Sequence, residues 1–340
     1  MSEKELPKVS IIALSYNHKK FIWESLLSIK KQTYPNIELI ILDDASTDGS
    51  QEILKKWKQS FPEDLLILHE KNMGNCKSFN QGFRMSKGKY IIDFATDDLM
   101  VPQRVAKQVE HLENLGEKWG VSYSDVLMID EQGKPIGTFY KRNKENQIVA
   151  YPPSGEVYRH VLGKQVISAS SMMIRREVLE KLNGYDESLV YEDYDFWVRS
   201  AKIFKYAFLP EVLTYKRVVA NSHRSGFYKK DNVSYLESTW IVCNKAFLQN
   251  ESTEEHHALA LTVSYYFQMA VLTHKFETAS KLATLLTQLR SMTWKEKVLY
   301  IVAKHKIRLY IFFILFILKE KLRNLLNKLN SLFKSKNSFF

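Results

Sequence analysis

The stretch from Val9 to Asp44 reads VSIIALSYNHKKFIWESLLSIKKQTYPNIELIILDD, and its pattern decides the fold. Val9–Leu14 is a mostly apolar run with the length of a buried strand. Phe21–Ile29 then carries apolar residues at helical spacing before Pro35 ends that pattern. Ile37–Leu42 is a second apolar run. A strand, a helix and a second strand in this order are typical of a βαβ unit with parallel strands.

The same alternation continues along the chain. Leu65–Leu68 and Tyr90–Phe94 predict a third and a fourth strand, and a helix is expected between Pro102 and Gly116. The run ISASSMMI at Ile167–Ile174 is expected to be a further strand. We therefore predict an α/β fold with a mostly parallel central sheet that is flanked by helices.

Beyond about Ser225 the apolar spacing becomes helical, which predicts a helical C-terminal extension. The expected domain ranges are 1–225 for the α/β domain, with halves 1–100 and 101–225, 226–293 for a helical region, and 294–340 for a basic tail.

Net charge is unevenly distributed over the 340 residues. The chain carries +11, but residues 294–340 alone contain eleven bases and two acids, a net of +9. The remaining residues are nearly neutral, which argues against a nucleic-acid-binding surface spread over the fold. Two cysteines cannot form a disulfide framework, and the polar N-terminus does not resemble a signal peptide, so a cytoplasmic location is expected.

The basic tail contains an apolar run and a leucine stripe. Leu309–Leu318 is ten residues long, too short to span a bilayer, and leucines from Leu315 to Leu332 recur at intervals of three and four. This pattern predicts an amphipathic helix at an anionic membrane surface, on the inner face of the cell membrane. A helix packed on the body and a short coiled coil are the alternatives, and an oligomer stays open.

Two pairs of carboxylates follow predicted strands. Asp43 and Asp44 end the second strand, and Asp97 and Asp98 follow the fourth. Ligands of open α/β sheets bind at the carboxyl ends of the strands, and carboxylate oxygens suit Mg²⁺ or Mn²⁺ beside a diphosphate. Each pair alone has a plainer interpretation, because Asp is favoured in turns and caps. Neither a G-x-G-x-x-G nor a P-loop motif occurs.

A third acidic group lies in VYEDYDFWVR at Val190–Arg199, where Glu192 and Asp193 stand among aromatic residues. Burial against rings would raise the pKa of a carboxyl toward the range of a general base. The alternative is a helix N-terminus with an acidic first turn.

Four motifs together resemble those of family 2 glycosyltransferases with the GT-A fold. They are the segment from Val9 to Ser50, KNMGN from Lys71, GKYIIDFATDDLMVPQR from Gly88, and GYDESLVYEDYDFWVR from Gly184. The resemblance covers about residues 8–217 and implies inverting transfer from a UDP-sugar to a hydroxyl of a glycan or lipid-linked saccharide, in surface polysaccharide synthesis.

The resemblance also implies roles for single residues. Asp193 matches the general base, Asp98 the ligand of Mn²⁺ or Mg²⁺, and Asp44 the acceptor for the uracil ring. The other implied nucleotide-sugar-binding residues are Leu14, Tyr16, Asn17, Asn72, Gly74 and Asp97, followed by Glu192, Arg217 and His223 as further candidates near the phosphates or the base.

One residue departs from the family pattern. Ala95 stands where many members carry the leading Asp of the metal motif, and Asp93 lies a strand step further back. A nucleotide-sugar-binding or scaffolding subunit with weak catalysis is therefore the alternative function. The Q-x-x-R-W motif of processive synthases is absent from the sequence, which favours transfer of one sugar per encounter.

Overall fold

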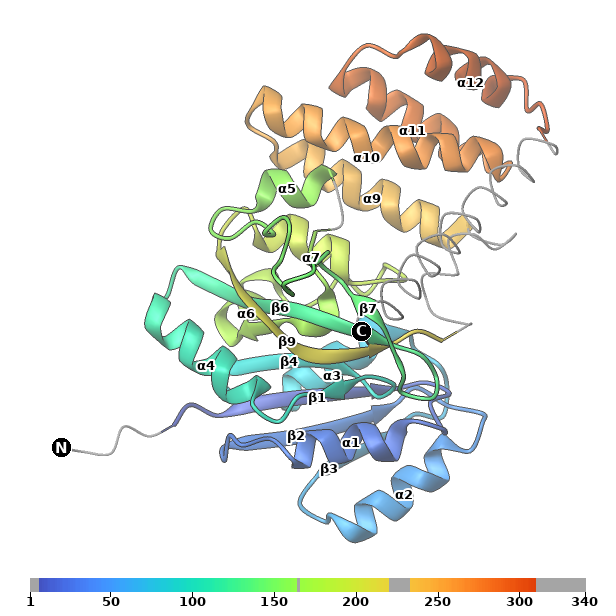
Figure 1. Ribbon diagram of the computed structural model, residues 1–340. Coiled ribbons are helices and arrows are strands. Elements are labelled where there is room, and N and C mark those ends of the chain that lie inside the picture. The colour runs from blue at the N-terminus through green and yellow to red at the C-terminus, as the bar shows by residue number, and fades with distance from the viewer. Residues whose placement is uncertain (1–5, 164–165, 220–232, 310–340) are drawn as a thin grey trace. The chain divides into compact units, whose positions relative to one another are not determined.

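The computed structural model describes residues 6–163, 166–219 and 233–309, which fall into two compact units (Figure 1). The first unit contains residues 6–157 and 166–218, and the second contains the described residues of 158–165 and 219–340. Each unit is described by itself below. His223 and most of the expected tail, including the leucine stripe, lie outside the described residues.

The N-terminal half of the first unit alternates strands and helices, as the apolar runs predict. Its elements are β1 (Val9–Ser15), α1 (Ile22–Lys30), β2 (Ile37–Asp43), α2 (Ser50–Ser60), β3 (Leu65–Leu68), α3 (Asn75–Met85) and β4 (Tyr90–Ala95). The strands β3, β2, β1 and β4 are neighbours in this order, and all three ladders between them are parallel. β1 is buried along its whole length because it lies in the middle of this group.

The rest of the first unit extends the same sheet. Its elements are β5 (Leu99–Met100), α4 (Arg104–Leu115), β6 (Trp119–Ile129), β7 (Pro135–Thr138), the 3₁₀ turn η1 (Ala169–Ser171), β8 (Met173–Arg175), α6 (Arg176–Leu182), α7 (Asp193–Ser200) and β9 (Lys205–Arg217). The sheet order is β3-β2-β1-β4-β8-β6-β9-β5, with β7 paired to β6. The long β6–β9 ladder is parallel, whereas the short strand β8 runs antiparallel to β4 and β6.

The expected strand at Ile167–Ile174 is wrong over most of its length. The segment forms the turn η1, and the short strand β8 begins only at Met173. The serine side chains give the physical reason, because the Ser171 hydroxyl donates to the carbonyl of Ser168 at 2.8 Å and accepts from the amide of Ser124. Such local bonds compete with a strand ladder.

One face of the sheet carries a continuous apolar core. Ile11 and Phe94 from the strands pack with Leu26 of α1, Trp57 of α2 and Val109 of α4, all of them buried. This packing fixes the strands, and with them the edge at which β1, β2 and β4 end. The α/β prediction with a helical C-terminal extension is thereby confirmed.

The second unit is helical. It consists of α5 (Tyr158–Gly163), α9 (Val233–Gln249), α10 (Thr253–Leu272), α11 (Phe276–Leu289) and α12 (Trp294–Lys304). Capping boxes start two of these helices, Ser252 with Glu255 at α10 and Thr293 with Glu296 at α12. None of the helices in the described part of the chain has the length and apolar character needed to cross a membrane.

Candidate active site

The carboxyl ends of three neighbouring strands meet at one edge of the sheet. Leu14 of β1 is in register with Leu42 of β2 on one side and Ala95 of β4 on the other. The sequence-predicted residues that follow these strands are therefore brought together. Tyr16 is 44% exposed there and can cover a ligand ring, whereas Leu14 is buried in the sheet.

Asn17 joins two of the loops at this edge. Its amide carbonyl accepts from the backbone N–H of Thr47 at 2.9 Å, and its own N–H donates to the Ser46 hydroxyl at 2.8 Å. Asn17 has a φ of 58°, which Asn tolerates better than most residues. The loop after β1 is thus fixed to the loop after β2.

Asp44 organises the loop that contains Asn72 and Gly74. Its carboxylate accepts from the backbone N–H groups of Met73 at 2.8 Å and Gly74 at 2.9 Å, and it lies 3.1 Å from Nδ1 of His69. The side-chain amide of Asn72 donates to the Asp44 carbonyl. Gly74 has a φ of 88°, a conformation that favours glycine. Asp44, Asn72 and Gly74 therefore form one preformed loop, in which Asp44 has few lone pairs left for a nucleobase.

Asp43 serves a different purpose from its neighbour. Its carboxylate is buried and accepts from the backbone N–H of Ser46 at 2.8 Å, from the Ser46 hydroxyl, and from Gln51. This is the turn-stabilising role that Asp often has after a strand.

The acidic pair after β4 is held by the loop after β1. The backbone N–H of Thr96 donates to the carbonyl of Leu14, and Nδ1 of His18 lies 2.9 Å from the Thr96 hydroxyl. Nε2 of His18 lies 3.9 Å from the Asp97 carboxylate. His18 was not identified from sequence, because its partners are about eighty positions away in the chain.

Asp98 is buried, and its environment disfavours the charged form. Burial and then the negative charge of Asp97 raise the pKa of Asp98 to about 7. Its carboxylate accepts from the backbone N–H of Arg217 at 2.9 Å. A buried carboxylate beside a second hard carboxylate fits a divalent cation, because Mg²⁺ typically uses one or two carboxylates together with substrate phosphates.

Arg217 positions this acidic pair from the end of β9. Its guanidinium donates to the carbonyls of Asp97 and Asp130 and to the Glu24 carboxylate, and the side chain is 2% exposed. A direct contact to a phosphate would require Arg217 to give up these bonds. In the structure Arg217 holds the backbone beside the acidic pair, and its contact with a phosphate stays a prediction.

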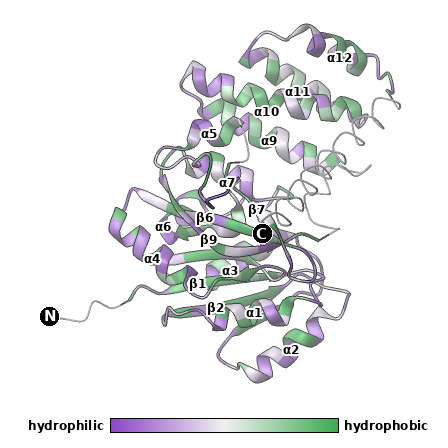
Figure 2. Cartoon of the chain, viewed as in Figure 1, coloured by the Kyte–Doolittle hydropathy of each residue, from purple (hydrophilic) through white to green (hydrophobic). Residues whose placement is uncertain are grey.

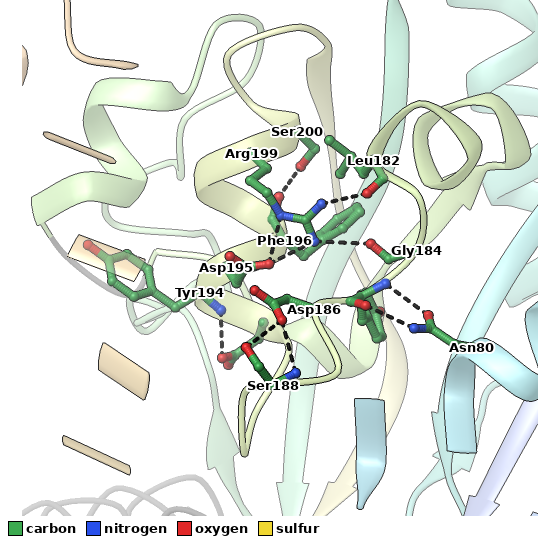
Figure 3. A network of polar contacts seen from close by, with 12 residues as sticks. Asn80, Leu182, Gly184, Asp186, Ser188, Tyr194, Asp195, Phe196, Arg199 and Ser200 are labelled. Carbon is green, nitrogen blue, oxygen red and sulfur yellow. Dashed lines mark hydrogen bonds and ion pairs between the residues drawn. The ribbon is translucent and has the colours of Figure 1, made fainter. Parts of the chain in front are cut away.

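The region around Glu192 and Asp193 is built on a network of polar contacts (Figure 3). Arg199 of α7 forms an ion pair with Asp195 at 2.7 Å and donates to the carbonyls of Leu182 and Gly184. Asn80 of α3 exchanges two hydrogen bonds with the backbone of Tyr185. The segment before α7 is therefore fixed to both α3 and α7.

Asp193 is the first residue of α7, as the helix N-terminus interpretation also predicts. A helix N-terminus by itself would lower the pKa of a carboxyl. Here burial and then the charge of Glu192 dominate and raise the pKa of Asp193 to about 7. The half-buried Asp193 is thus poised to exchange a proton near neutral pH.

Asp93 joins this group, although no role was predicted for it. The Tyr185 hydroxyl donates to its carboxylate at 3.1 Å, while burial and then the charge of Glu192 raise the pKa of Asp93 well above its usual range. Glu192 in turn accepts from the side-chain amide of Asn75 at 2.6 Å, and burial raises its pKa. Period-two alternation puts Asp93 and Phe94 on opposite sheet faces, which is the signal that could have identified it.

The positive charge of Lys216 acts on the acids of both groups. Its positive charge lowers the pKa values of Asp98, Glu192 and Asp193, partly offsetting burial in each case. Lys216 is exposed and lies on β9 next to Arg217. The strand-end acids and the α7 acids therefore lie within reach of the same positive charge.

A cysteine nucleophile and a metal site built from protein side chains alone have less support than the acidic site. Burial raises the pKa of the Cys76 thiol, which makes it a poor nucleophile. Within the described ranges, no group of three or more His, Cys, Asp or Glu side chains is arranged to hold a metal ion.

Comparison with solved structures defines the fold class. The chain resembles the S. aureus protein TarS in complex with UDP, with a TM-score of 0.61 and 16% identity over 88% of this chain and 87% of that one. A mannosyltransferase from Pyrobaculum calidifontis, in complex with GDP-Man and Mn²⁺, has a TM-score of 0.55 and 16% identity over 88% and 85% of the two chains. The fold is that of the GT-A glycosyltransferases.

The sequence comparisons define the family. The pattern of glycosyl transferase family 2 matches residues 10–182. The uncharacterized glycosyltransferase MJ1057 of Methanocaldococcus jannaschii is 30% identical over 71% of this chain and 82% of its own length. TuaG of Bacillus subtilis, provisionally named a teichuronic acid biosynthesis glycosyltransferase, is 25% identical over 69% and 87%. The chain therefore belongs to glycosyl transferase family 2.

Proposed function

We propose that this glycosyltransferase moves one sugar at a time from a UDP-sugar to a hydroxyl of a glycan or lipid-linked saccharide, with inversion, during surface polysaccharide synthesis. The observation that carries the proposal is Asp193, a half-buried carboxyl whose pKa is raised to about 7 beside the strand-end site. The likeness to the UDP complex of TarS supports a UDP-sugar as the donor, and the likeness to TuaG supports a role in surface polysaccharide synthesis.

In this proposal Asp193 is the general base. It takes the proton of the acceptor hydroxyl while the hydroxyl oxygen bonds to the anomeric carbon, and the bond from that carbon to the diphosphate breaks on the opposite face. A single displacement of this kind inverts the configuration. The charge of Glu192 favours proton uptake by Asp193, since it raises the pKa of its neighbour.

The strand-end loops would bind the donor. Tyr16 offers an exposed ring for the base, and the ordered loop of Asp44, Asn72 and Gly74 offers polar groups beside it. Leu14, Asn17 and Asp97 complete the proposed nucleotide-sugar site. Because the Asp44 carboxylate already accepts backbone bonds, its contribution is mainly to hold the loop in its binding shape.

Asp98 and Asp97 would hold Mn²⁺ or Mg²⁺. When bound, the cation supplies positive charge that neutralises the leaving diphosphate. His18 near the Asp97 carboxylate, and Arg217 through bonds to Asp97 and Asp98, would keep the two acids in place.

We place the reaction at the cytoplasmic face of the membrane, because residues 294–340 carry a net charge of +9. Such a segment is attracted to anionic lipid headgroups. A lipid-linked acceptor would be presented at the same surface.

A nucleotide panel tests the proposal. Thermal unfolding is measured with UDP, GDP, UDP-sugars and GDP-mannose, each with and without Mn²⁺, and release of UDP from the stabilising UDP-sugar is then followed. Stabilisation by UDP-sugars with Mn²⁺-dependent release of UDP is expected. Stabilisation without transfer or hydrolysis would favour a nucleotide-sugar-binding subunit instead, in which Ala95 has weakened catalysis, and stabilisation by GDP-mannose alone would contradict the donor class.

A further inference from the structure

Helix α12 presents an apolar stripe on its outer face. Trp294, Val298 and Ile301 follow one another at intervals of four and three, which puts their side chains on one face of the helix. They are 71%, 51% and 54% exposed, respectively. An exposed tryptophan with two β-branched neighbours on one helix face is unusual for a surface that faces only water.

The opposite face of α12 is the one that packs on its own unit. Glu296 and Ala303 are buried, and Glu296 forms an ion pair with Arg290 at 2.8 Å. Glu296 also accepts from the Ser264 hydroxyl of α10 and from the backbone N–H of Thr293. These bonds fix the rotation of the helix about its axis, so the apolar stripe faces away from the core of its own unit.

The exposed charged residues of the α12 segment itself are all of one sign. Residues 294–308 contain a single acid, Glu296, and it points inward. The exposed charged residues are five bases, namely Lys295, Lys297, Lys304, Lys306 and Arg308. The outer surface of this segment therefore combines apolar side chains with positive charge only.

We infer that this face of α12 docks on an anionic phospholipid bilayer, with Trp294, Val298 and Ile301 at the level of the lipid headgroups and the bases on the phosphates. Tryptophan prefers this interfacial level, and a basic polar face adds attraction to anionic lipids. The inference rests on the proposed membrane location and adds to it a defined contact surface, separate from residues 310–340.

Charge favours a bilayer over the other possible occupants. A second copy of the chain would bring five bases against five bases in a face-to-face contact. Residues 310–340 carry six bases and one acid, so they would also meet this surface with like charge. An anionic lipid surface is the occupant that complements it.

The test uses the full chain and vesicles of phosphatidylcholine with or without phosphatidylglycerol. Val298→Glu with Ile301→Glu places two acids in the stripe, and Val149→Glu with Leu248→Glu makes the same change at two exposed apolar positions elsewhere. We expect the stripe variant to bind anionic vesicles at least about tenfold more weakly, because it loses apolar contact and repels the headgroups. The matched control should bind like wild type, and circular dichroism checks that both fold.

A second measurement reads the position of Trp294. Brominated lipids in anionic vesicles should quench part of the tryptophan fluorescence of the wild type, and Trp294→Phe should remove that part. Equal binding by the stripe variant and wild type, or quenching that persists in Trp294→Phe, would overturn the inference while leaving the tail as the membrane anchor. If the wild type does not bind anionic vesicles, both membrane proposals are wrong. Sugar transfer to soluble acceptors tests the proposed chemistry separately. A concentration-dependent dimer that the stripe variant lacks would assign this face to a protein contact.

Discussion

Asp98 of the first unit and Glu296 of the second are both buried carboxylates, but their surroundings are opposite. Asp98 lies beside another acid, and burial with the charge of Asp97 raises its pKa to about 7. Glu296 accepts bonds from Arg290, Ser264 and Thr293, and the bond from Arg290 above all lowers its pKa to about 2. A buried acid with its cation stabilises a fold, whereas a buried acid beside another acid is held in place for a ligand or a proton.

The same contrast exists within the first unit. Asp195 is buried and forms an ion pair with Arg199, while Asp193, two positions earlier, has its pKa raised by burial and by Glu192. The sequence cannot distinguish these two acids by residue type, because only the neighbours in the fold differ. The predictions below test this distinction, beginning with the largest expected effect.

Replacing the proposed base should have the largest effect. Asp193→Asn is expected to reduce kcat by about 10³-fold, because general base catalysis typically contributes a factor of this size, while UDP binding is retained. Glu180→Gln on α6 is the control, since the Glu180 side chain is 59% exposed and pairs with Arg176 of the same helix. Transfer and UDP affinity are measured for both variants, and near wild-type transfer by Asp193→Asn would remove the assignment.

Breaking the ion pair of Glu296 should cost about 3 kcal/mol of unfolding free energy, because it leaves a buried charge without its cation. Arg290→Met makes this change, and urea unfolding measures it. Lys281→Met is the matched control, because Lys281 and Glu237 form a pair whose side chains are 35% and 27% exposed, and it should cost less than about 1 kcal/mol. Equal losses in the two variants would contradict the contrast between the pair with a buried acid and the half-buried pair.

Neutralising Asp98 should stabilise the protein in the absence of divalent cations. The pKa of Asp98 is higher in the folded state than its usual 3.8, so folding loses stability as the pH rises from about 4 to about 7. Asp98→Asn is therefore expected to gain about 2 kcal/mol at pH 8 in EDTA and to flatten this slope.

Thermal unfolding over a range of pH measures this effect of Asp98, and two other acids serve as comparisons. Glu296 has the opposite sign, since its stabilisation is present above its usual pKa of 4.5 and is lost as the pH falls toward about 2. Asp195→Asn should destabilise at pH 8, because Arg199 loses its ion-pair partner. A loss of stability in Asp98→Asn would show that the acid is structural.

The smallest expected effect concerns Lys216. The acid limb of kcat/KM should lie near pH 7, where Asp193 loses its proton, with activity falling as the pH decreases. Lys216→Met removes a charge that lowers the pKa of Asp193, so the limb should move up by about 0.3 to 0.5 pH unit. Lys216→Arg should restore it, and Lys205→Met, at the far end of β9, should leave it in place. An unmoved limb in Lys216→Met would exclude this coupling.

Much of the fold could be predicted because buried parallel strands appear as apolar runs. β1, β2, β3 and β4 start at the predicted residues, and their ends differ by at most one. Ile167–Ile174 could not be predicted in this way, because its serines bond locally and to α4 and β6. Propensity and periodicity carry no information on such tertiary partners.

The sequence by itself determined the positions of the four strands of the first half, the acids at the strand ends and the concentration of basic residues near the C-terminus. These features are local, since each depends on residue type and spacing along a short segment. The tertiary structure alone decided which acids are paired. Asn75 and Glu192 lie 117 positions apart, as Arg217 and Asp98 lie 119 apart, and the pKa of each carboxyl depends on the neighbours that folding brings to it.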